Sequence, residues 1–221
     1  MSRNSFITGD HYHIYNHGID GRNLFLDKYD FERFRKSLTA FNSIKPIGSI
    51  FENQHKKKVL GGTEVKVLPR EERLVDLVAY CINPNHFHLV LRQNIDGGIS
   101  RFMKSVSGGY TKYINNKLKR RGSIFENVFR SKHAEDEDYL LHLSAYVNLN
   151  DRVHGLVFEE TGRSTSLSSW AEYTEDIPSE ICEKNIILSQ FENNKEKYNL
   201  FGEYLLPDMT SRKEDDGQES Y

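Results

Sequence analysis

Two histidines in the segment HFHLVL, residues 86–91, have the residue type and the spacing to bind one metal ion. Side chains of an extended strand alternate between two faces, so His86 and His88 share a face and lie about 7 Å apart along the strand. Two imidazoles at this spacing can converge on one ion, because a histidine–metal bond is roughly 2 Å long. Two protein ligands leave coordination positions open for a phosphate oxygen, as a catalytic metal requires.

A second histidine pair, His11 and His13, has the same spacing near the start of the chain. Paired histidines on a sheet more often pack or cap than bind metal, so the spacing alone is a weak signal. We expect His11 and His13 to be structural. His86 and His88 are the stronger metal candidates because of the residues around them in the sequence.

A polar stripe runs along the segment 140–150, which has the apolar spacing of a helix. Three polar residues fall on one flank at intervals of four: His142, Tyr146 and Asn150. Two apolar strips enclose this flank, whereas Ser144 and Asn148 lie on the flank expected to face solvent. Polar side chains away from water need partners or a task. Tyr146 is therefore either a hydrogen-bonded core residue or a nucleophile one turn from a ligand, Asn150.

The elements that must position these residues follow from periodicity and turn chemistry. Alternating or continuous apolar runs predict strands, apolar residues at helical spacing predict helices, and Asn83-Pro84-Asn85 predicts a hairpin turn. Residues 47–73 are weakly patterned, with short strands expected near Val59 and Val65. The predicted strands are 11–16, 74–82 and 86–91, and the predicted helices are 27–44, 99–118 and 136–150.

This order predicts an α+β fold, a ferredoxin-like antiparallel sheet with helices on one face and a C-terminal helical appendage. We expect a main domain over residues 1–165 and an acidic helical appendage over 166–210. The polar end, 211–221, is predicted to be disordered.

Charge is distributed unevenly, although the formal net charge is only −2. Residues 101–133 hold nine Lys and Arg against one acidic residue, whereas residues 134–221 hold seven against twenty. A basic middle segment indicates a local polyanion site, but a solvated helix face would have the same composition. Charge alone leaves both interpretations open.

The chain has no apolar run of the roughly 20 residues needed to span a bilayer, and its first residues lack the apolar stretch of a secretory signal. No membrane association is expected. Cys81 and Cys182 lie far apart in the sequence, so a disulfide framework is not expected and a reducing cytoplasm is the predicted compartment.

Two longer motifs resemble a known family. PNHFHLVL, residues 84–91, resembles the histidine-hydrophobic-histidine strand of HUH nucleases, and HLSAYVNLNDRVHGLV, residues 142–157, resembles the tyrosine helix of single-tyrosine transposases. The REP-associated tyrosine transposases are the most similar subgroup. Further similarity at HYHIYNHGIDGRNLF, GSIFENVFRSKHAEDEDYLL and STSLSSWAEY extends the resemblance over roughly residues 10–175.

The resemblance implies a metal-dependent enzyme that cleaves and rejoins single-stranded DNA in transposition, through a 5′-phosphotyrosine intermediate. It implies Tyr146 as the nucleophile and His86, His88 and Asn150 as ligands of Mg²⁺ or Mn²⁺. His142, one turn before Tyr146, would transfer a proton, orient the tyrosine or serve a structural role. Single-stranded or hairpin DNA would be the partner of a monomer or homodimer. The basic segment would bind it through Lys112, Lys117, Lys119, Arg120, Arg121, Arg130 and Lys132, with aromatic side chains interspersed for base stacking.

Two departures and two alternatives accompany this interpretation. Asn150 is followed by Asp151 where the family usually has Pro, and His17 stands where Arg is frequent. Neither departure removes a catalytic group. One alternative is a domesticated DNA-binding protein without cleavage. The other is a replication-initiator-like HUH nuclease, which the lack of a helicase-like segment in the 221 residues disfavours.

Overall fold

The computed structural model describes residues 6–48, 50, 68–156, 166–177 and 181–216. The short strands expected near Val59 and Val65 lie outside the described residues. None of the helices in the described ranges is long and apolar enough to cross a membrane.

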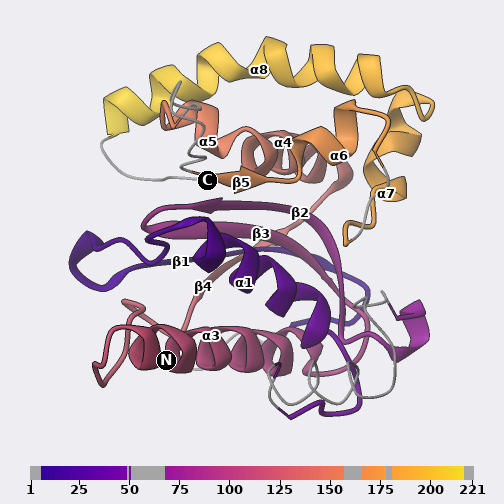
Figure 1. Ribbon diagram of the computed structural model, residues 1–221. Coiled ribbons are helices and arrows are strands. Elements are labelled where there is room, and N and C mark those ends of the chain that lie inside the picture. Colours follow the sequence, from indigo (N-terminus) through magenta and orange to yellow (C-terminus); the bar gives the residue numbers. More distant parts are fainter. Residues whose placement is uncertain (1–5, 49, 51–67, 157–165, 178–180, 217–221) are drawn as a thin grey trace.

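A five-stranded antiparallel sheet forms the centre of the molecule (Figure 1). Its order is β4-β1-β3-β2-β5, so the first four strands have the arrangement of a ferredoxin-like fold and β5 extends one edge. The strands are β1 His11–His17, β2 Val75–Asn83, β3 His86–Gln93, β4 Arg130–Ala134 and β5 Leu167–Ser168. Strand β4 was not predicted, because its sequence RSKHA is mostly exposed and has no apolar alternation.

Helices α1 (Lys28–Ala40) and α3 (Gly98–Lys117) cover one face of the sheet (Figure 1). The Asp27 carboxylate accepts hydrogen bonds from the backbone N–H groups of Tyr29 and Asp30 and thereby caps the start of α1. Apolar residues of both helices pack on the strand residues that point away from His86 and His88. These contacts form the first hydrophobic core.

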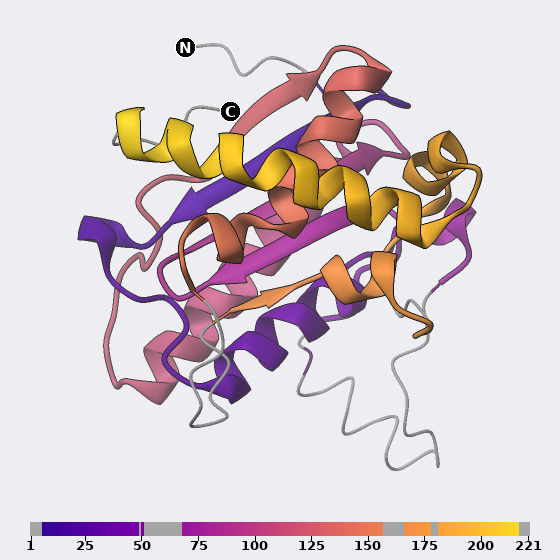
Figure 2. The same cartoon turned by 90° about the horizontal axis from the view of Figure 1, so that it is seen from above.

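The C-terminal helices cover the other face (Figures 1 and 2). They are α4 Glu137–Asn148, α5 Asn150–Val153, α6 Trp170–Thr174, α7 Asn185–Leu188 and α8 Lys195–Asp216. Elsewhere in the chain, short 3₁₀ turns are η1 Ile19–Gly21 and η2 Arg70–Glu72, and η3 Ser189–Phe191 follows α7. The expectation of helices on one face therefore holds for α1 and α3 and is corrected for α4 and the helices after it. Every residue of β2 is buried, so this strand needs cover on both faces.

Residues on both sides of the expected domain boundary at 165/166 share the second core. Leu143 and Val147 of α4 belong to the same buried cluster as Trp170 and Tyr198. Helix α8 runs to Asp216, so the first six residues of the segment predicted to be disordered are helical. The predicted helix 136–150 is broken after Asn148, and Asn150 begins α5.

Helix α8 also covers the flank of α4 that was expected to face solvent. Ser144 and Asn148 are fully buried, and both hydrogen-bond the Tyr198 hydroxyl, at 3.1 and 2.9 Å. The prediction of a solvent-facing flank is wrong, because the residues that cover it come from fifty positions further along the chain.

We expect Tyr198→Phe to lower the free energy of unfolding by about 1–3 kcal/mol, because it leaves two buried polar groups without this partner. Urea unfolding followed by circular dichroism measures the change. Tyr204→Phe is the matched control on the same helix, because Tyr204 is 81% exposed and its loss should change stability by less than about 0.5 kcal/mol. Equal effects of the two substitutions would contradict this account of the buried network.

Candidate active site

The face of the sheet that meets α4 carries the two candidate metal histidines. In the antiparallel ladder His86 lies opposite Asn83 of β2 and His17 of β1. His88 lies opposite Cys81 and Tyr15 in the same way. Both histidines are buried. Strand pairing places the side chains of Asn83, His17, Cys81 and Tyr15 beside them.

The hydrogen bonds of His86 indicate which ring nitrogen is available as a ligand. Its Nδ1 lies 2.8 Å from Asn85 Oδ1, which can only accept, so Nδ1 carries the proton. Its Nε2 lies 2.8 Å from the Asn83 amide nitrogen, which can only donate. Both contacts are compatible with a His86 Nε2 that carries no proton, which is the form that binds a metal.

Asn150 brings an oxygen to the same point. Its Oδ1 lies 3.1 Å from His86 Nε2, and its buried Nδ2 makes no hydrogen bond with the described residues. Two ligand atoms at right angles around a cation, with bonds of about 2.1 Å, lie about 3.0 Å apart. His86 and Asn150 therefore fit a divalent cation. No group of three or more His, Cys, Asp or Glu able to hold a metal occurs in the described ranges, so amide oxygens would have to complete such a site.

His88 is held by the first strand. His13 Nε2 lies 2.8 Å from His88 Nδ1, the two rings stack at 5.0 Å, and Tyr15 stacks on His88 from the same strand at 5.8 Å. His13 therefore touches the candidate site, beyond the structural role that its spacing indicated. His11 lies at the other end of β1, opposite Arg92, where burial and the Arg92 guanidinium lower its pKa to about 4.

Tyr146 reaches the histidines from the helix above. Its ring makes edge contacts with those of His88 and His13, at centroid distances of 5.7 and 6.1 Å, and it is 4% exposed. The structure thus brings together Tyr146, His86, His88 and Asn150, the four residues that the sequence singled out. Asn150 sits beside His86 although it begins a separate helical turn.

Two other tyrosines, Tyr110 and Tyr113, lie on α3 across the sheet. The Tyr110 hydroxyl donates to the Leu24 carbonyl at 2.9 Å and that of Tyr113 to the Asp30 carboxylate at 2.9 Å. Burial raises the pKa of both hydroxyls above the ordinary value. Both tyrosines therefore serve packing on the face opposite the histidines.

His142 is separated from this cluster. It is exposed, and its ring contacts Phe201 of α8 at 5.4 Å. The sequence patterns did not single out two other imidazoles near His86. Their ring centroids lie 5.3 Å (His17) and 4.9 Å (His154) from that of His86. Strand register places His17 there, and a signal for His154 was its position one turn after Asn150.

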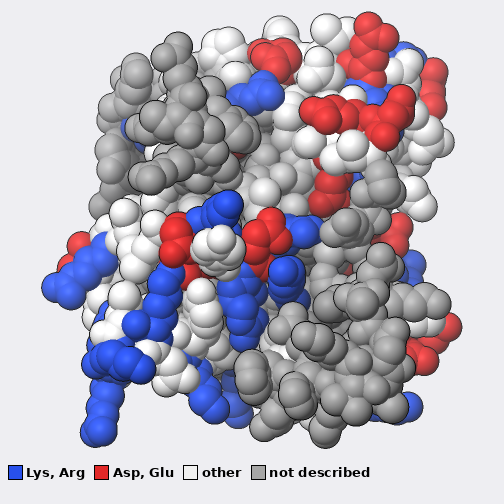
Figure 3. All heavy atoms as spheres, viewed as in Figure 1, with Lys and Arg blue, Asp and Glu red and all other residues white. Residues whose placement is uncertain are grey.

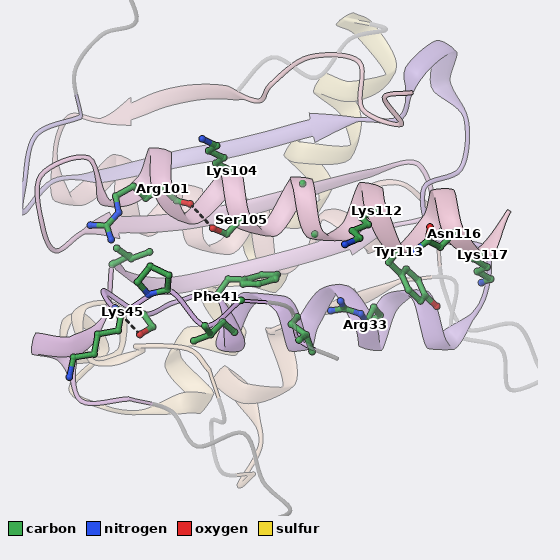
Figure 4. Close-up of a pocket in the computed structure, with 18 residues that line it drawn as sticks. Arg33, Phe41, Lys45, Arg101, Lys104, Ser105, Lys112, Tyr113, Asn116 and Lys117 are labelled. Atoms are coloured by element: carbon green, nitrogen blue, oxygen red, sulfur yellow. Dashed lines mark hydrogen bonds between the residues drawn. The ribbon is translucent and has the colours of Figure 1, made fainter. Parts of the chain in front are cut away.

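A basic groove of about 1360 Å³ lies between α1, α3 and the segment after α1, on the sheet face away from Tyr146 (Figure 4). Its cationic lining residues are Arg33, Lys45, Arg101, Lys104, Lys112 and Lys117. Figure 3 shows Lys and Arg side chains gathered over the lower part of the molecule, around α1 and α3, and Asp and Glu over the C-terminal helices. The charge asymmetry of the sequence thus becomes a separation in space.

The predicted DNA-binding residues differ in their surroundings. Lys117 lies 2.6 Å from Asp30 and 2.9 Å from Asp27, so its charge is compensated within the protein. Arg130 pairs with Glu126 at 3.4 Å, and Lys132 lies over the Tyr139 ring on edge strand β4. Of the remaining predicted residues, Lys112, Lys119 and Arg121 are exposed. Arg120 is half-buried and donates to the Ser123 carbonyl.

Comparison with known proteins adds three findings. The family described as IS200-like transposases matches residues 49–150, a range that includes His86, His88, Tyr146 and Asn150. A solved structure of a REP-associated tyrosine transposase bound to a REP hairpin matches with 14% identity and a TM-score of 0.47, covering 71% of this chain and 75% of that chain. No curated protein matches the chain.

Proposed function

Residues 49–150 of the chain match the IS200-like transposase family, and on this premise we propose that the protein cleaves and rejoins single-stranded DNA through Tyr146. The observation that carries the proposal is the contact of the Tyr146 ring with His88, beside the His86–Asn150 pair. A nucleophile, two imidazoles and an amide oxygen meet at one point on the sheet. A core tyrosine would not need this set of neighbours.

The reaction follows from the chemistry of a phenol beside a phosphodiester. The Tyr146 hydroxyl gives up its proton as its oxygen attacks phosphorus and forms a P–O bond. The bond to the 3′ oxygen breaks, and that oxygen takes up a proton and leaves as a hydroxyl. The 5′ end of the downstream strand is then linked to Tyr146. Attack by another 3′-hydroxyl reverses these steps, so bond energy is retained and DNA is rejoined.

His86, His88 and Asn150 would hold a Mg²⁺ or Mn²⁺ ion at this point. Such an ion, when bound, neutralises charge on the non-bridging oxygens of the phosphate. The protein supplies orientation, because Asn85 fixes the tautomer of His86 and His13 holds the ring of His88.

A labelling experiment tests the proposal directly. The protein is incubated with Mn²⁺ and a pool of single-stranded DNA hairpins with randomised flanks, labelled at either the 3′ or the 5′ end. A 5′-phosphotyrosine retains only the downstream strand, so we expect a labelled protein band on a denaturing gel with 3′-labelled DNA and a shortened free strand with 5′-labelled DNA. Tight binding without either product would support the alternative, a DNA-binding protein that does not cleave.

We propose that the basic segment 101–133 supplies most of the affinity for DNA. The groove in Figure 4 lies across the sheet from Tyr146, so DNA held there would be a segment flanking the cleaved one. Edge strand β4 and the turn after α3 offer a second cationic surface.

Neutralising four cations of this segment to Gln should weaken DNA binding and flatten its salt dependence; they are Arg120, Arg121, Arg130 and Lys132. Each lost phosphate contact removes about 0.7 from the slope of log K against log salt for a single strand, so four would remove nearly 3. Fluorescence anisotropy across a salt series measures the slope. Lys195→Gln/Lys197→Gln is the control, because these lysines pair with Asp176 and Glu192 in the acidic C-terminal region. An unchanged slope in the fourfold variant would place the DNA elsewhere.

A further inference from the structure

Asn83 lies at the candidate metal site although sequence patterns assigned it only to a turn. It is the last residue of β2, faces His86 directly across the ladder and is fully buried. Its Nδ2 lies 2.8 Å from His86 Nε2 and 2.6 Å from Asn150 Oδ1, and these two atoms lie 3.1 Å from each other. The three atoms thus form a nearly equilateral triangle.

An amide NH₂ group fits this triangle poorly. By the cosine rule the three distances give an angle of about 70° at Asn83 Nδ2, whereas its two N–H bonds diverge by about 120°. Both hydrogen bonds cannot be linear at once, and hydrogen bonds weaken as they bend. The amide holds His86 and Asn150 together but satisfies each of them incompletely.

Three acceptor atoms would fit the same triangle better. The three ligand atoms on one face of an octahedron, with bonds of about 2.0–2.1 Å, lie about 2.8–3.0 Å apart. The observed separations of 2.6, 2.8 and 3.1 Å lie close to these values. A half-turn of the Asn83 amide about its Cβ–Cγ bond exchanges the positions of Nδ2 and Oδ1 and would place an oxygen at this corner.

We propose that Asn83 is a further metal ligand, which bridges His86 and Asn150 through its NH₂ group without metal and presents Oδ1 to a divalent cation when one binds. This assignment rests on the proposed function and leaves His88 as a ligand. The half-turn costs little, because Asn83 Oδ1 now accepts a weak hydrogen bond from the Cys81 thiol at 3.4 Å.

A second amide oxygen also changes which metal the site favours. Two imidazoles suit Zn²⁺ or Ni²⁺, whereas carbonyl oxygens suit Mg²⁺ and Mn²⁺. With Asn83 and Asn150 together, oxygens match the two histidines in number. The site is thereby biased toward the hard cations that phosphoryl chemistry uses.

Mn²⁺ binding to the full chain, followed by the electron paramagnetic resonance signal of free Mn²⁺, tests the assignment without any activity measurement. We expect Asn83→Ala to weaken Mn²⁺ binding about tenfold or more, because a ligand is lost. Asn83→Asp keeps the shape and adds a charged oxygen, so it should tighten Mn²⁺ binding about tenfold. Asn42→Ala is the matched control, because Asn42 is a buried amide that bonds the backbone of Val75 at the far end of β2.

The outcomes separate this inference from the proposed function. Binding by Asn83→Ala that equals or exceeds that of the unchanged protein overturns the assignment of Asn83. If Asn83→Ala does not fold, Asn83→Asp decides, and unchanged or weaker binding overturns it. Failure of the unchanged protein to bind Mn²⁺, or binding that survives His86→Ala/His88→Ala, overturns the proposed metal site as well.

Discussion

Replacing Tyr146 with Phe should abolish the covalent protein–DNA intermediate and reduce DNA cleavage roughly a thousandfold or more, because no other atom at that position can attack phosphorus. The substitution removes only the hydroxyl of a ring that packs against His88 and His13, so the fold and DNA binding should persist. Denaturing gels with 3′-labelled hairpin DNA measure the adduct, and peptide mapping identifies the linked residue.

Tyr110→Phe and Tyr113→Phe are the controls for this experiment. Both hydroxyls hydrogen-bond on the opposite face of the sheet, so both variants should still form the adduct, with some loss of stability for Tyr110. An adduct mapped to either of these residues, or one that persists in Tyr146→Phe, would overturn the central proposal.

The double substitution His86→Ala/His88→Ala should eliminate metal-dependent cleavage and reduce Mn²⁺ binding at least a hundredfold, because it removes both imidazole ligands at once. Binding is measured by titration calorimetry and cleavage by the gel assay. The chain should still fold, because the apolar residues of β3 that build the first core are unchanged.

His142→Ala is the matched control for the histidine substitutions. His142 is exposed and contacts Phe201, so we expect Mn²⁺ binding to be unchanged. Cleavage that is lost in His142→Ala with Mn²⁺ binding intact would support the proton-transfer role suggested by its position one turn before Tyr146. Metal-dependent cleavage that survives in the double variant would show that the metal is bound elsewhere.

Local patterns in the sequence determined much of this protein. Alternation along β3 places His86 and His88 on one face and Phe87 on the other, and this depends only on the two-residue repeat of a strand. Asp27 and Asp136 cap α1 and α4 close to the predicted starts, because capping is a contact of two or three residues. The α+β class and the four-residue spacing that brings Tyr146 and Asn150 to the same histidine strand follow from equally local rules.

Tertiary structure decided the rest, because pairing between distant segments has no local signature. Strand β4 has no apolar pattern and exists because β1 offers it a free edge. His13 reaches His88 only through the register of β1 on β3, and Ser144 and Asn148 are buried only because α8 returns across α4. Asn83 reads as a turn residue in the chain, yet the β2–β3 register sets its amide between His86 and Asn150. The sequence could name a candidate nucleophile and two candidate metal histidines, but the atoms around them come from distant segments, such as His13 beside Tyr146, and only folding brings those segments together.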